Sequence, residues 1–544
     1  MLNQIQGRTG RRVIALLIFI SLSVVIWRNF DLALYSPPQD WSSSSSASDR
    51  KTIDSFKYIP SSYDWSKAEV FHPVEDMKSP PTGRSKQFPT IQAEYSQKTK
   101  DSIPFARREM IKAKFVKSWE AYKTYAWTKD ELMPLSGKGK QSLSGWSAQL
   151  IDALDTLWIM DLKDDFRRAV KEVAVIDWSK TTDMSVNLFE VTIRYLGGLL
   201  SAYELSEEPA LLDKAKELGD MLYTTFDTPN RLPSHWFNFE KARLGQQTAD
   251  PNMSGAAGGS LGMEFTRLSQ LTGDAKYYDA TERIKQFFYR HQNQTAMPGL
   301  WPLQMNYREE IMLHPDKFTL GSGADSLYEY LPKMHALLGG LDPEYEEMTI
   351  TALDAAKENL LFRPMTSDDA NILLSGNALV KDEKTSLKPE IEHLACFVGG
   401  TYGFAGRLLS REDYVDLGSR LTAGCVWAYD SFETNIMPEI SQVVACDALD
   451  GPCAYDASLF PHNRQHALPD GFAKVRDSRY LLRPEAIESV FYMWRITGDQ
   501  IWRDAAWRMY QAIIKETETE TAFASIDDVK VHSSNKADSM EVRS

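Results

Sequence analysis

Apolar residues recur at helical spacing along most of the chain from Asp101 onward. Three segments show the pattern clearly: 186–205, 261–278 and 487–502. Residues three or four positions apart lie on one face of an α-helix, so the pattern predicts amphipathic helices. Long alternating runs of β-branched residues, which are typical of strands, are scarce. The spacing therefore predicts a mostly helical, all-α protein.

The three segments also resemble one another. Each places a glutamate early, at Glu190, Glu264 and Glu488. Two of them end in the same turn, with the sequences LTGD (271–274) and ITGD (496–499). Glycine suits the position after a helix, and threonine or aspartate caps the next one. Repeated helix pairs of this kind favour an α/α toroid or solenoid, and roughly 440 residues at about 60 per pair give seven pairs, near enough to close a barrel.

The N-terminal region has a different pattern. Arg8, Arg11 and Arg12 precede VIALLIFISLSVVIW (13–27), a run without a charge. The run is short for a membrane-spanning helix, but no small-x-small cleavage site follows it, and short spans fit the thinner early secretory membranes. The positive-inside rule then places residues 1–12 in the cytosol and the rest in the lumen. This predicts a single-pass type II signal anchor in the endoplasmic reticulum or Golgi membrane.

Residues 28–100 are rich in serine, proline and charge, including the run Ser42 to Ser46. Such a composition buries little apolar surface and predicts a disordered, solvated stem. The folded domain is expected to occupy residues 101–544. Its net charge does not favour nucleic acid as a partner, because the whole chain carries −14 and phosphate binding needs clustered lysine and arginine.

Four cysteines lie close together in the sequence, at Cys396, Cys425, Cys446 and Cys453. A lumenal location would permit disulfides, and pairing of neighbours is one of three possible connectivities. Zinc is the alternative, but the C-x-x-C and H-E-x-x-H spacings are lacking. Two N-x-[ST] sequons, at Asn252 and Asn293, would be open to glycosylation in the lumen.

Several acidic residues fall at predicted helix starts. Glu190 and Arg194 are one helical turn apart, as in a surface ion pair, yet the helix around them is apolar nearly all round. Asp325 follows a glycine-rich turn and has the position of a helix cap. Glu485 and Glu488 follow Pro484 on one face of a first turn, where acidic residues usually complement the helix dipole.

His393 lies between Glu392 and the apolar sequence LACF, where an ion pair with a neighbouring glutamate is as plausible as catalysis. The glycine-rich run 254–262 lacks the Gly-Lys-[Ser/Thr] of a phosphate loop, and the chain has no G-x-S-x-G elbow. Carboxylates from several helix starts around one axis are the arrangement that a glycosidase needs: one acid to protonate the leaving oxygen and one base to activate water.

Long motifs make the assignment more specific. They are SWEAYKTYAWTKDELMPLSG, QLIDALDTLWIMDL, VNLFEVTIRYLGGLLSAY, GMEFTRLSQLTGDAKYYD, PGLWP, GADSLYEYL, HLACF, LLRPEAIES and FASIDDV. In this order the chain resembles the class I α-1,2-mannosidases of glycoside hydrolase family 47 over residues 101–541, particularly the fungal and Golgi-type members. The resemblance implies an (α/α)7 barrel and inverting hydrolysis of terminal α-1,2-linked mannose on high-mannose N-glycans by a monomeric enzyme.

The resemblance also implies roles for individual residues. Glu190 corresponds to a proton donor, Glu485 to the base that activates water, and Asp325 and Glu439 to further catalytic carboxylates. Six positions correspond to residues that contact the sugar or support those that do: Arg194, Glu264, His393, Arg483, Glu488 and Glu541. Cys396 and Cys425 match the family's shared disulfide, whereas Cys446 and Cys453 fall in an insertion.

Two departures from the family pattern affect the expected activity. Family members that remove a single mannose tend to carry arginine at the position of Gly323, so its absence predicts broader trimming. Family members also continue beyond Glu541 to a threonine that binds calcium, whereas this sequence ends at Ser544. The expectation is therefore a calcium-dependent mannosidase with a C-terminal truncation, and the alternative is a catalytically impaired, lectin-like protein that binds mannose glycans.

Overall fold

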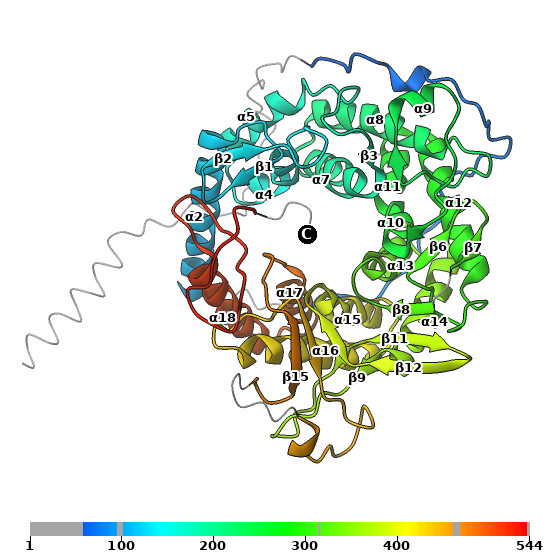
Figure 1. Cartoon of the computed structure of the whole chain (residues 1–544). Coiled ribbons are helices and arrows are strands. Elements are labelled where there is room, and N and C mark those ends of the chain that lie inside the picture. The colour runs from blue at the N-terminus through cyan, green and yellow to red at the C-terminus, as the bar shows by residue number, and fades with distance from the viewer. Residues whose placement is uncertain (1–57, 95–101, 314–315, 461–467, 541–544) are drawn as a thin grey trace, which may run out of the picture. The chain divides into compact units, whose positions relative to one another are not determined.

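Helices in two layers form a ring in the unit Lys57–Ser544 (Figure 1). The computed structural model describes residues 58–94, 102–313, 316–460 and 468–540. The outer layer contains α2 (Ser102–Tyr125), α5 (Lys163–Val173), α8 (Pro209–Tyr223), α12 (Ala275–His291), α14 (Pro343–Asn359), α16 (Glu412–Ser431) and α18 (Gln500–Thr517). The inner layer contains α3 (Ala148–Asp152), α4 (Leu154–Ile159), α7 (Gly197–Ser206), α11 (Gly262–Thr272), α13 (Asp325–Leu337), α15 (Val398–Leu408) and α17 (Glu485–Thr497).

Each longer inner helix packs against the outer helix that follows it in the chain, and neighbouring inner helices pack against one another. The two repeated turns work as the sequence predicts. Gly273 and Gly498 take left-handed backbone conformations after α11 and α17. Asp274 and Asp499 then cap α12 and α18 by accepting backbone N–H groups. These turns reverse the chain from the inner to the outer layer, which confirms the predicted repetition of helix pairs.

Short antiparallel strands join the helices. The prediction of an all-α protein is therefore only partly correct for the described residues. Two-stranded sheets pair β1 (Glu131–Met133) with β2 (Lys138–Lys140), β3 (Val186–Asn187) with β4 (Trp236–Phe237), and β9 (Leu361–Phe362) with β10 (Leu374–Ser375). Three-stranded sheets have the orders β5 (Met253–Ser254), β6 (Gln304–Asn306), β7 (Ile311–Met312); β12 (Lys384–Lys388), β11 (Asn377–Lys381), β8 (Asp316–Thr319); and β13 (Glu390–Glu392), β14 (Ile440–Val443), β15 (Phe472–Asp477). The strands are too short and irregular for period-two patterning to predict them.

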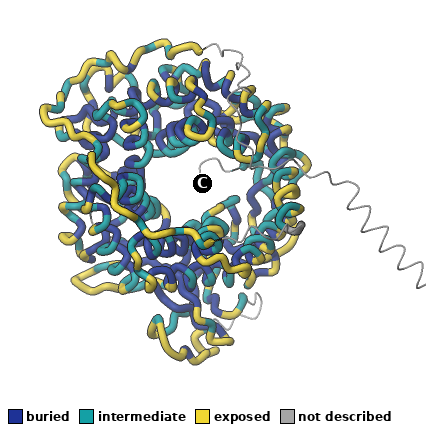
Figure 2. Tube along the Cα trace, turned by 180° about the vertical axis from the view of Figure 1, so that it is seen from behind, coloured by how far each residue is buried: buried dark blue, intermediate teal, exposed yellow. Residues whose placement is uncertain are grey.

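The core lies between the two layers of helices, where buried residues concentrate (Figure 2). One cluster joins α16, α17 and α18 through side chains such as Val415, Met493, Trp502 and Met509. Burial of these apolar faces supplies the driving force that holds each pair to its neighbours. It also fixes the inner helices α11, α13 and α17, which carry Glu264, Asp325, Glu485 and Glu488.

Residues 58–94 form an extended strap over the outer helices. Backbone N–H groups of the strap donate to side-chain carboxylates, and other bonds join strap and barrel backbones. These bonds are Ser61 to Glu217 (3.1 Å), Phe71 and His72 to Asp227 (both 2.8 Å), Lys78 to Asp279 (2.8 Å), Ile59 to the Ala174 carbonyl (2.9 Å), Lys86 to that of Gly339 (2.8 Å) and Ala93 to that of Arg495 (2.8 Å). The prediction of a disordered stem therefore does not hold for residues 58–94, because carboxylate and carbonyl oxygens of the barrel accept hydrogen bonds from the strap's backbone N–H groups.

Trp65 fixes the strap near the candidate site. Its side chain is buried, and its ring contacts those of Phe237 (5.7 Å between centroids) and Phe239 (5.2 Å). Phe237 belongs to β4, which pairs with β3 through Val186. Strand β3 leads directly into α6 (Leu188–Glu190). The strap thus supports the segment that carries Glu190.

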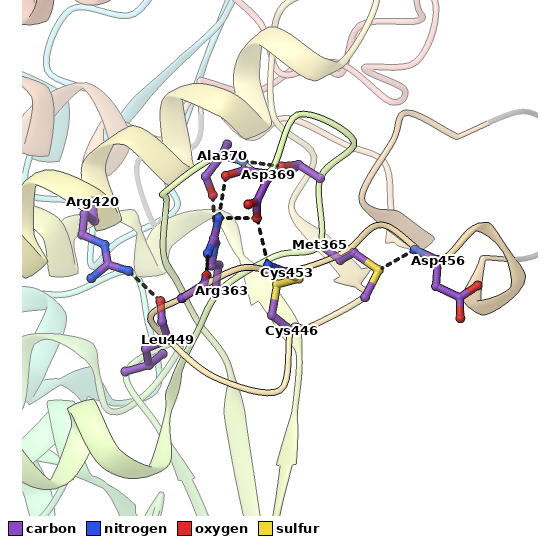
Figure 3. Close-up of a disulfide and its surroundings, with 11 residues drawn as sticks. Arg363, Met365, Asp369, Ala370, Arg420, Cys446, Leu449, Cys453 and Asp456 are labelled. Carbon is purple, nitrogen blue, oxygen red and sulfur yellow. Dashed lines mark hydrogen bonds and ion pairs between the residues drawn. A yellow bond between two sulfur atoms is a disulfide. The ribbon is translucent and has the colours of Figure 1, made fainter.

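The structure contains the two disulfides Cys396–Cys425 and Cys446–Cys453, which confirms neighbour pairing. The first joins the segment before α15 to α16. The second closes a short loop held by two buried arginines (Figure 3). The Arg363 guanidinium donates to the Gly451 carbonyl and the Asp369 carboxylate, and Arg420 donates to the Leu449 carbonyl. These contacts fix the loop independently of the disulfide.

Replacing both Cys446 and Cys453 with alanine is expected to lower the free energy of unfolding by about 2.5 kcal/mol, the loop-closure entropy of a short cross-link. Urea unfolding of the double variant, compared with the wild-type protein, measures this loss. A loss below about 0.5 kcal/mol would mean that the arginine contacts alone hold the loop.

The predicted anchor at residues 13–27 lies outside the described residues, as does Glu541. Within the described ranges, no helix combines the length and the apolar character needed to cross a membrane.

Candidate active site

Glu190 lies at an irregular part of the inner layer. It ends the short helix α6, and the π-helical segment η2 (Val191–Leu196) follows it. Asn187 caps this turn by accepting the backbone N–H of Glu190 at 3.0 Å. The Arg194 Nε donates to Glu190 Oε2 at 2.9 Å, and both side chains are largely buried. The Glu190–Arg194 pair, which has the spacing of a surface ion pair, is therefore largely buried. The π-helical segment beside it is a second indication of a functional site, because π-helical turns are frequent at such sites.

Glu264 lies beside this segment, on α11. A Cβ atom at Gly197 would be 3.6 Å from Glu264 Oε1, so the glycine allows α7 and the carboxylate to approach each other. Tyr330 on α13 donates to the same oxygen at 2.8 Å. Burial raises the pKa of Glu264 to about 7. A carboxyl group with such a pKa exchanges its proton near neutrality.

Asp325 is the first residue of α13 and combines two features. Its Oδ1 accepts the backbone N–H of Ser326 at 2.7 Å, the local bonding that the helix-start position predicts. Burial nevertheless raises its pKa to about 6, to which the charges of Glu329 and Glu392 contribute. Burial and like charges thus outweigh the stabilising hydrogen bonds at this helix start.

Glu485 and Glu488 occupy the first turn of α17. Burial raises the pKa of each to about 7, and Glu488 adds its charge to the effect on Glu485. The dipole at an exposed helix start favours ionised carboxylates and would lower their pKa. The raised pKa values of Glu485 and Glu488 are therefore due to burial and not to the dipole. Leu482, three residues before Glu485, has a left-handed φ of 59°. Such strain in a bulky residue is often found at functional sites.

Arg483 and Glu439 form a largely buried ion pair beside this turn. The Arg483 Nε lies 2.7 Å from one carboxylate oxygen of Glu439 and 2.9 Å from the other. Burial raises the pKa of Glu439, although Arg483 opposes the rise. Glu439 is therefore a partner of Arg483, which it holds near Glu485.

His393 does not form the ion pair considered from the sequence. It is fully buried, and its Nε2 lies 2.8 Å from the Tyr429 hydroxyl. Burial and the charge of Arg483 lower its pKa to about 3, so the imidazole is neutral. The adjacent carboxylates bind elsewhere: Glu390 pairs with Arg476, and Glu392 accepts the backbone N–H of Ser322. His393 is thus enclosed beside Tyr429 and Arg483 and has no access to solvent.

Two buried carboxylate oxygens are free to accept hydrogen bonds from a ligand. Glu264 Oε2 and Glu485 Oε2 are buried, and neither has a hydrogen-bond partner among the described residues. A buried acceptor without a donor costs free energy, roughly 1–3 kcal/mol. Sugar hydroxyls or water would supply the missing donors. These oxygens are the clearest sign that the inner helices bind a polar molecule.

A metal site is harder to find. In the part of the chain that the structure describes, one group of carboxylates is close enough to share an ion: Glu282, Asp342 and Glu344. The Lys285 ammonium already lies 2.8 Å, 2.9 Å and 2.5 Å from them, respectively. Because the ammonium already occupies the position between these carboxylates and offsets part of their charge, the group does not fit a divalent cation. It also belongs to the outer helices α12 and α14 and not to the candidate site.

Sequence reasoning missed Glu329. It lies one turn after Asp325 on α13, and its charge acts on Asp325, Glu264 and Glu488 alike. It is therefore central to the acidic group. Its i, i+4 spacing from Lys333 resembles an ordinary surface pair, and the spacing alone gives no signal of burial. The shared GADSLYEYL motif was the only available indication.

Residues 114–542 match the family described as Glycosyl hydrolase family 47. The chain is 34% identical over 456 residues to the probable mannosyl-oligosaccharide α-1,2-mannosidase 1B of Aspergillus fumigatus, covering 80% of this chain and 87% of that protein. It is 32% identical over 451 residues to the mannosyl-oligosaccharide α-1,2-mannosidase of Penicillium citrinum, covering 80% and 84%.

A solved structure agrees. The α-1,2-mannosidase from Trichoderma reesei matches with a TM-score of 0.72 and 29% identity, covering 80% of this chain and 90% of that one. The family match spans most of the ring and all the described candidate residues. The chain belongs to glycosyl hydrolase family 47.

Proposed function

We propose that the chain is a mannosyl-oligosaccharide α-1,2-mannosidase, a glycosidase that trims terminal α-1,2-linked mannose from high-mannose N-glycans. Family membership supports this proposal. The observation that carries it is the acidic group on the inner helices, with buried, unpartnered oxygens on Glu264 and Glu485. A glycosidase needs carboxyl groups that hold or accept a proton near neutrality, and burial produces that property here.

In the proposed reaction, Glu190 donates a proton to the glycosidic oxygen as the bond from that oxygen to C1 of mannose breaks. Glu485 accepts a proton from a water molecule, whose oxygen forms the new bond to C1 from the opposite face. The product mannose is then inverted at C1. Asp325 is the third central carboxylate. Two guanidinium groups offset part of the negative charge of this site. Arg483 is paired with Glu439, and Arg194 is paired with Glu190.

The pH profile follows from these groups. The base must be ionised, and burial raises the pKa of Glu485 to about 7. We therefore expect a bell-shaped profile: kcat/KM rises with pH up to about 7 as Glu485 ionises, and falls at higher pH as the proton donor Glu190 loses its proton. Initial rates on α-1,2-mannobiose between pH 4 and pH 9 measure the profile. A profile that is flat between pH 5 and pH 7 would exclude Glu485 as the base.

Broad trimming is part of the proposal. Gly323 has φ +83°, and a Cβ atom there would lie 3.1 Å from Leu303. Backbone and packing thus disfavour a side chain at position 323, so no guanidinium extends from this position toward the glycan. We expect a nine-mannose glycan to lose more than one mannose, as measured by mass spectrometry. A digest that stops after the first cleavage would contradict this expectation.

Membership of the family suggests a metal-dependent enzyme, and the family resemblance of the sequence implies that the metal is calcium. Calcium, when bound, orients sugar hydroxyls as a Lewis acid. The one group of carboxylates among the described residues that is close enough to share an ion does not fit calcium, so the steps above rest on the chain's own residues. Mannose release that EGTA abolishes and calcium restores would support the dependence. Binding of mannobiose without release, unaffected by EGTA, would favour the lectin-like alternative.

We further propose that residues 13–27 anchor a monomeric enzyme in the endoplasmic reticulum or Golgi membrane, with the barrel in the lumen. Two disulfides suit an oxidising compartment. Protection of the barrel from added protease in intact microsomes tests the orientation, and digestion without detergent would exclude it.

A further inference from the structure

Lys333 lies among the acidic residues of the candidate site and has no role in the reaction described above. Its Nζ is 2.5 Å from Glu329 Oε1, one turn earlier on α13, and the side chains are 25% and 19% exposed. On the other side, the Lys333 Nζ is 6.0 Å from the centre of the Tyr492 ring on α17. The ammonium therefore bridges the space between two inner helices.

A small cavity adjoins this ammonium. Glu329, Lys333, Glu488, Tyr492, Thr401 and Phe404 line it, and its volume of about 10 Å³ is enough for one water molecule. Glu329 and Lys333 come from α13, Glu488 and Tyr492 from α17, and the other two from α15. A water in this cavity would have carboxylates, an ammonium and hydroxyls as partners. Lys333 and Glu488 thus share one enclosed polar space.

The titratable groups facing Lys333 come from three helices. Glu329 and Tyr330 lie on α13, Glu264 on α11, and Glu488 and Tyr492 on α17; the cavity residues of α15 carry no charge. Burial raises the pKa of Glu488 and Glu264 to about 7, and Lys333 acts against the rise in both. Burial lowers the pKa of Lys333 itself, but Glu329 and the other acidic neighbours outweigh burial and raise it. The ammonium stays protonated across the working range.

We propose that Lys333 is a positioning residue for mannose binding: its ammonium holds the Glu329 carboxylate and faces the cavity that Glu488 also lines, so that both carboxylates can accept hydroxyl hydrogen bonds from the sugar. The inference rests on the proposed function, because Glu488 is taken to contact substrate. It assigns Lys333 an effect on binding and not on bond cleavage. Lys333 opposes the raised pKa of Glu488, so without the ammonium Glu488 keeps its proton to a higher pH and an acceptor is lost.

The test compares Lys333→Met with Lys333→Arg in the full chain. Lys381→Met, on the exposed end of β11, is the matched control. For Lys333→Met we expect KM for α-1,2-mannobiose to rise about tenfold at pH 6 and by less than threefold at pH 8, with kcat within threefold of wild type. Lys333→Arg keeps the charge and is expected to restore most of the affinity at pH 6. Lys381→Met is expected to match wild type.

Calorimetric binding of the same disaccharide at both pH values gives a second readout that needs no turnover. An equal loss of affinity at pH 6 and pH 8, or a loss confined to kcat, would overturn the positioning role. Lack of rescue by arginine would also contradict it. Wild-type protein that binds mannobiose without releasing mannose would contradict the proposed hydrolysis but leave the pH-dependent binding test of Lys333 intact.

Discussion

Replacing Glu485 with glutamine is expected to lower kcat on α-1,2-mannobiose by 10²- to 10⁴-fold, roughly the contribution of a general base. Glutamine keeps the shape of the side chain but cannot accept a proton from water. Binding should change little, because the amide still offers an oxygen to the sugar. Initial rates and calorimetric binding separate the two effects. Glu383→Gln, in an exposed turn, is the matched control and should retain wild-type activity.

The same substitution carries a second expectation. Burial disfavours the charged form of Glu485, and its Oε2 has no partner among the described residues. An amide avoids the cost of a buried charge, so Glu485→Gln should melt at the wild-type temperature or above it. A variant that is inactive and strongly destabilised would indicate a structural role for Glu485. A fully active variant would exclude it as the base.

Replacing Trp65 with alanine is expected to lower the free energy of unfolding by roughly 3–5 kcal/mol, as for other buried tryptophans. Trp65 is 4% exposed and packs against Phe237 and Phe239, which lie outside the strap. Its loss would leave a cavity between the strap and β4. Urea unfolding followed by circular dichroism gives the value. Met184→Ala, at a side chain that is 96% exposed, should stay within about 0.5 kcal/mol of wild type.

The Trp65 experiment also tests the relation between strap and site. Strand β4 pairs with β3, which precedes Glu190. Under conditions where Trp65→Ala remains folded, we expect kcat/KM to fall as the support for Glu190 loosens. A stability loss below 1 kcal/mol would mean that residues 58–94 are only loosely attached, as the sequence-based stem prediction implied.

Sequence patterns predicted the repeated part of the fold well. The turns at 271–274 and 496–499 signal helix ends because glycine and aspartate act locally, through backbone conformation and capping. The strap gives no such signal. It uses isolated contacts, such as Trp65 and the carboxylates of Glu217 and Asp227, and its own residues have no periodicity. Its binding surface consists of residues far away in the chain, so local composition indicated disorder.

The candidate site shows the same division. Glu190, Asp325 and Glu485 could be found because they occupy helix starts within long motifs. Glu329 and Lys333 could not, because an i, i+4 acid–base pair has the same spacing on a surface as in an enclosed site. His393 was ambiguous for a related reason. Its neutral, buried state depends on Tyr429 and Arg483, which are distant in the sequence.

The most direct test of the central claim is the anomeric form of the mannose first released from α-1,2-mannobiose, followed by proton NMR immediately after mixing. One carboxyl group acts on the leaving oxygen and another on water at the opposite face, so we expect β-mannose first, with the α-anomer appearing later by mutarotation. Release of α-mannose as the first product, or no release of mannose, would contradict it.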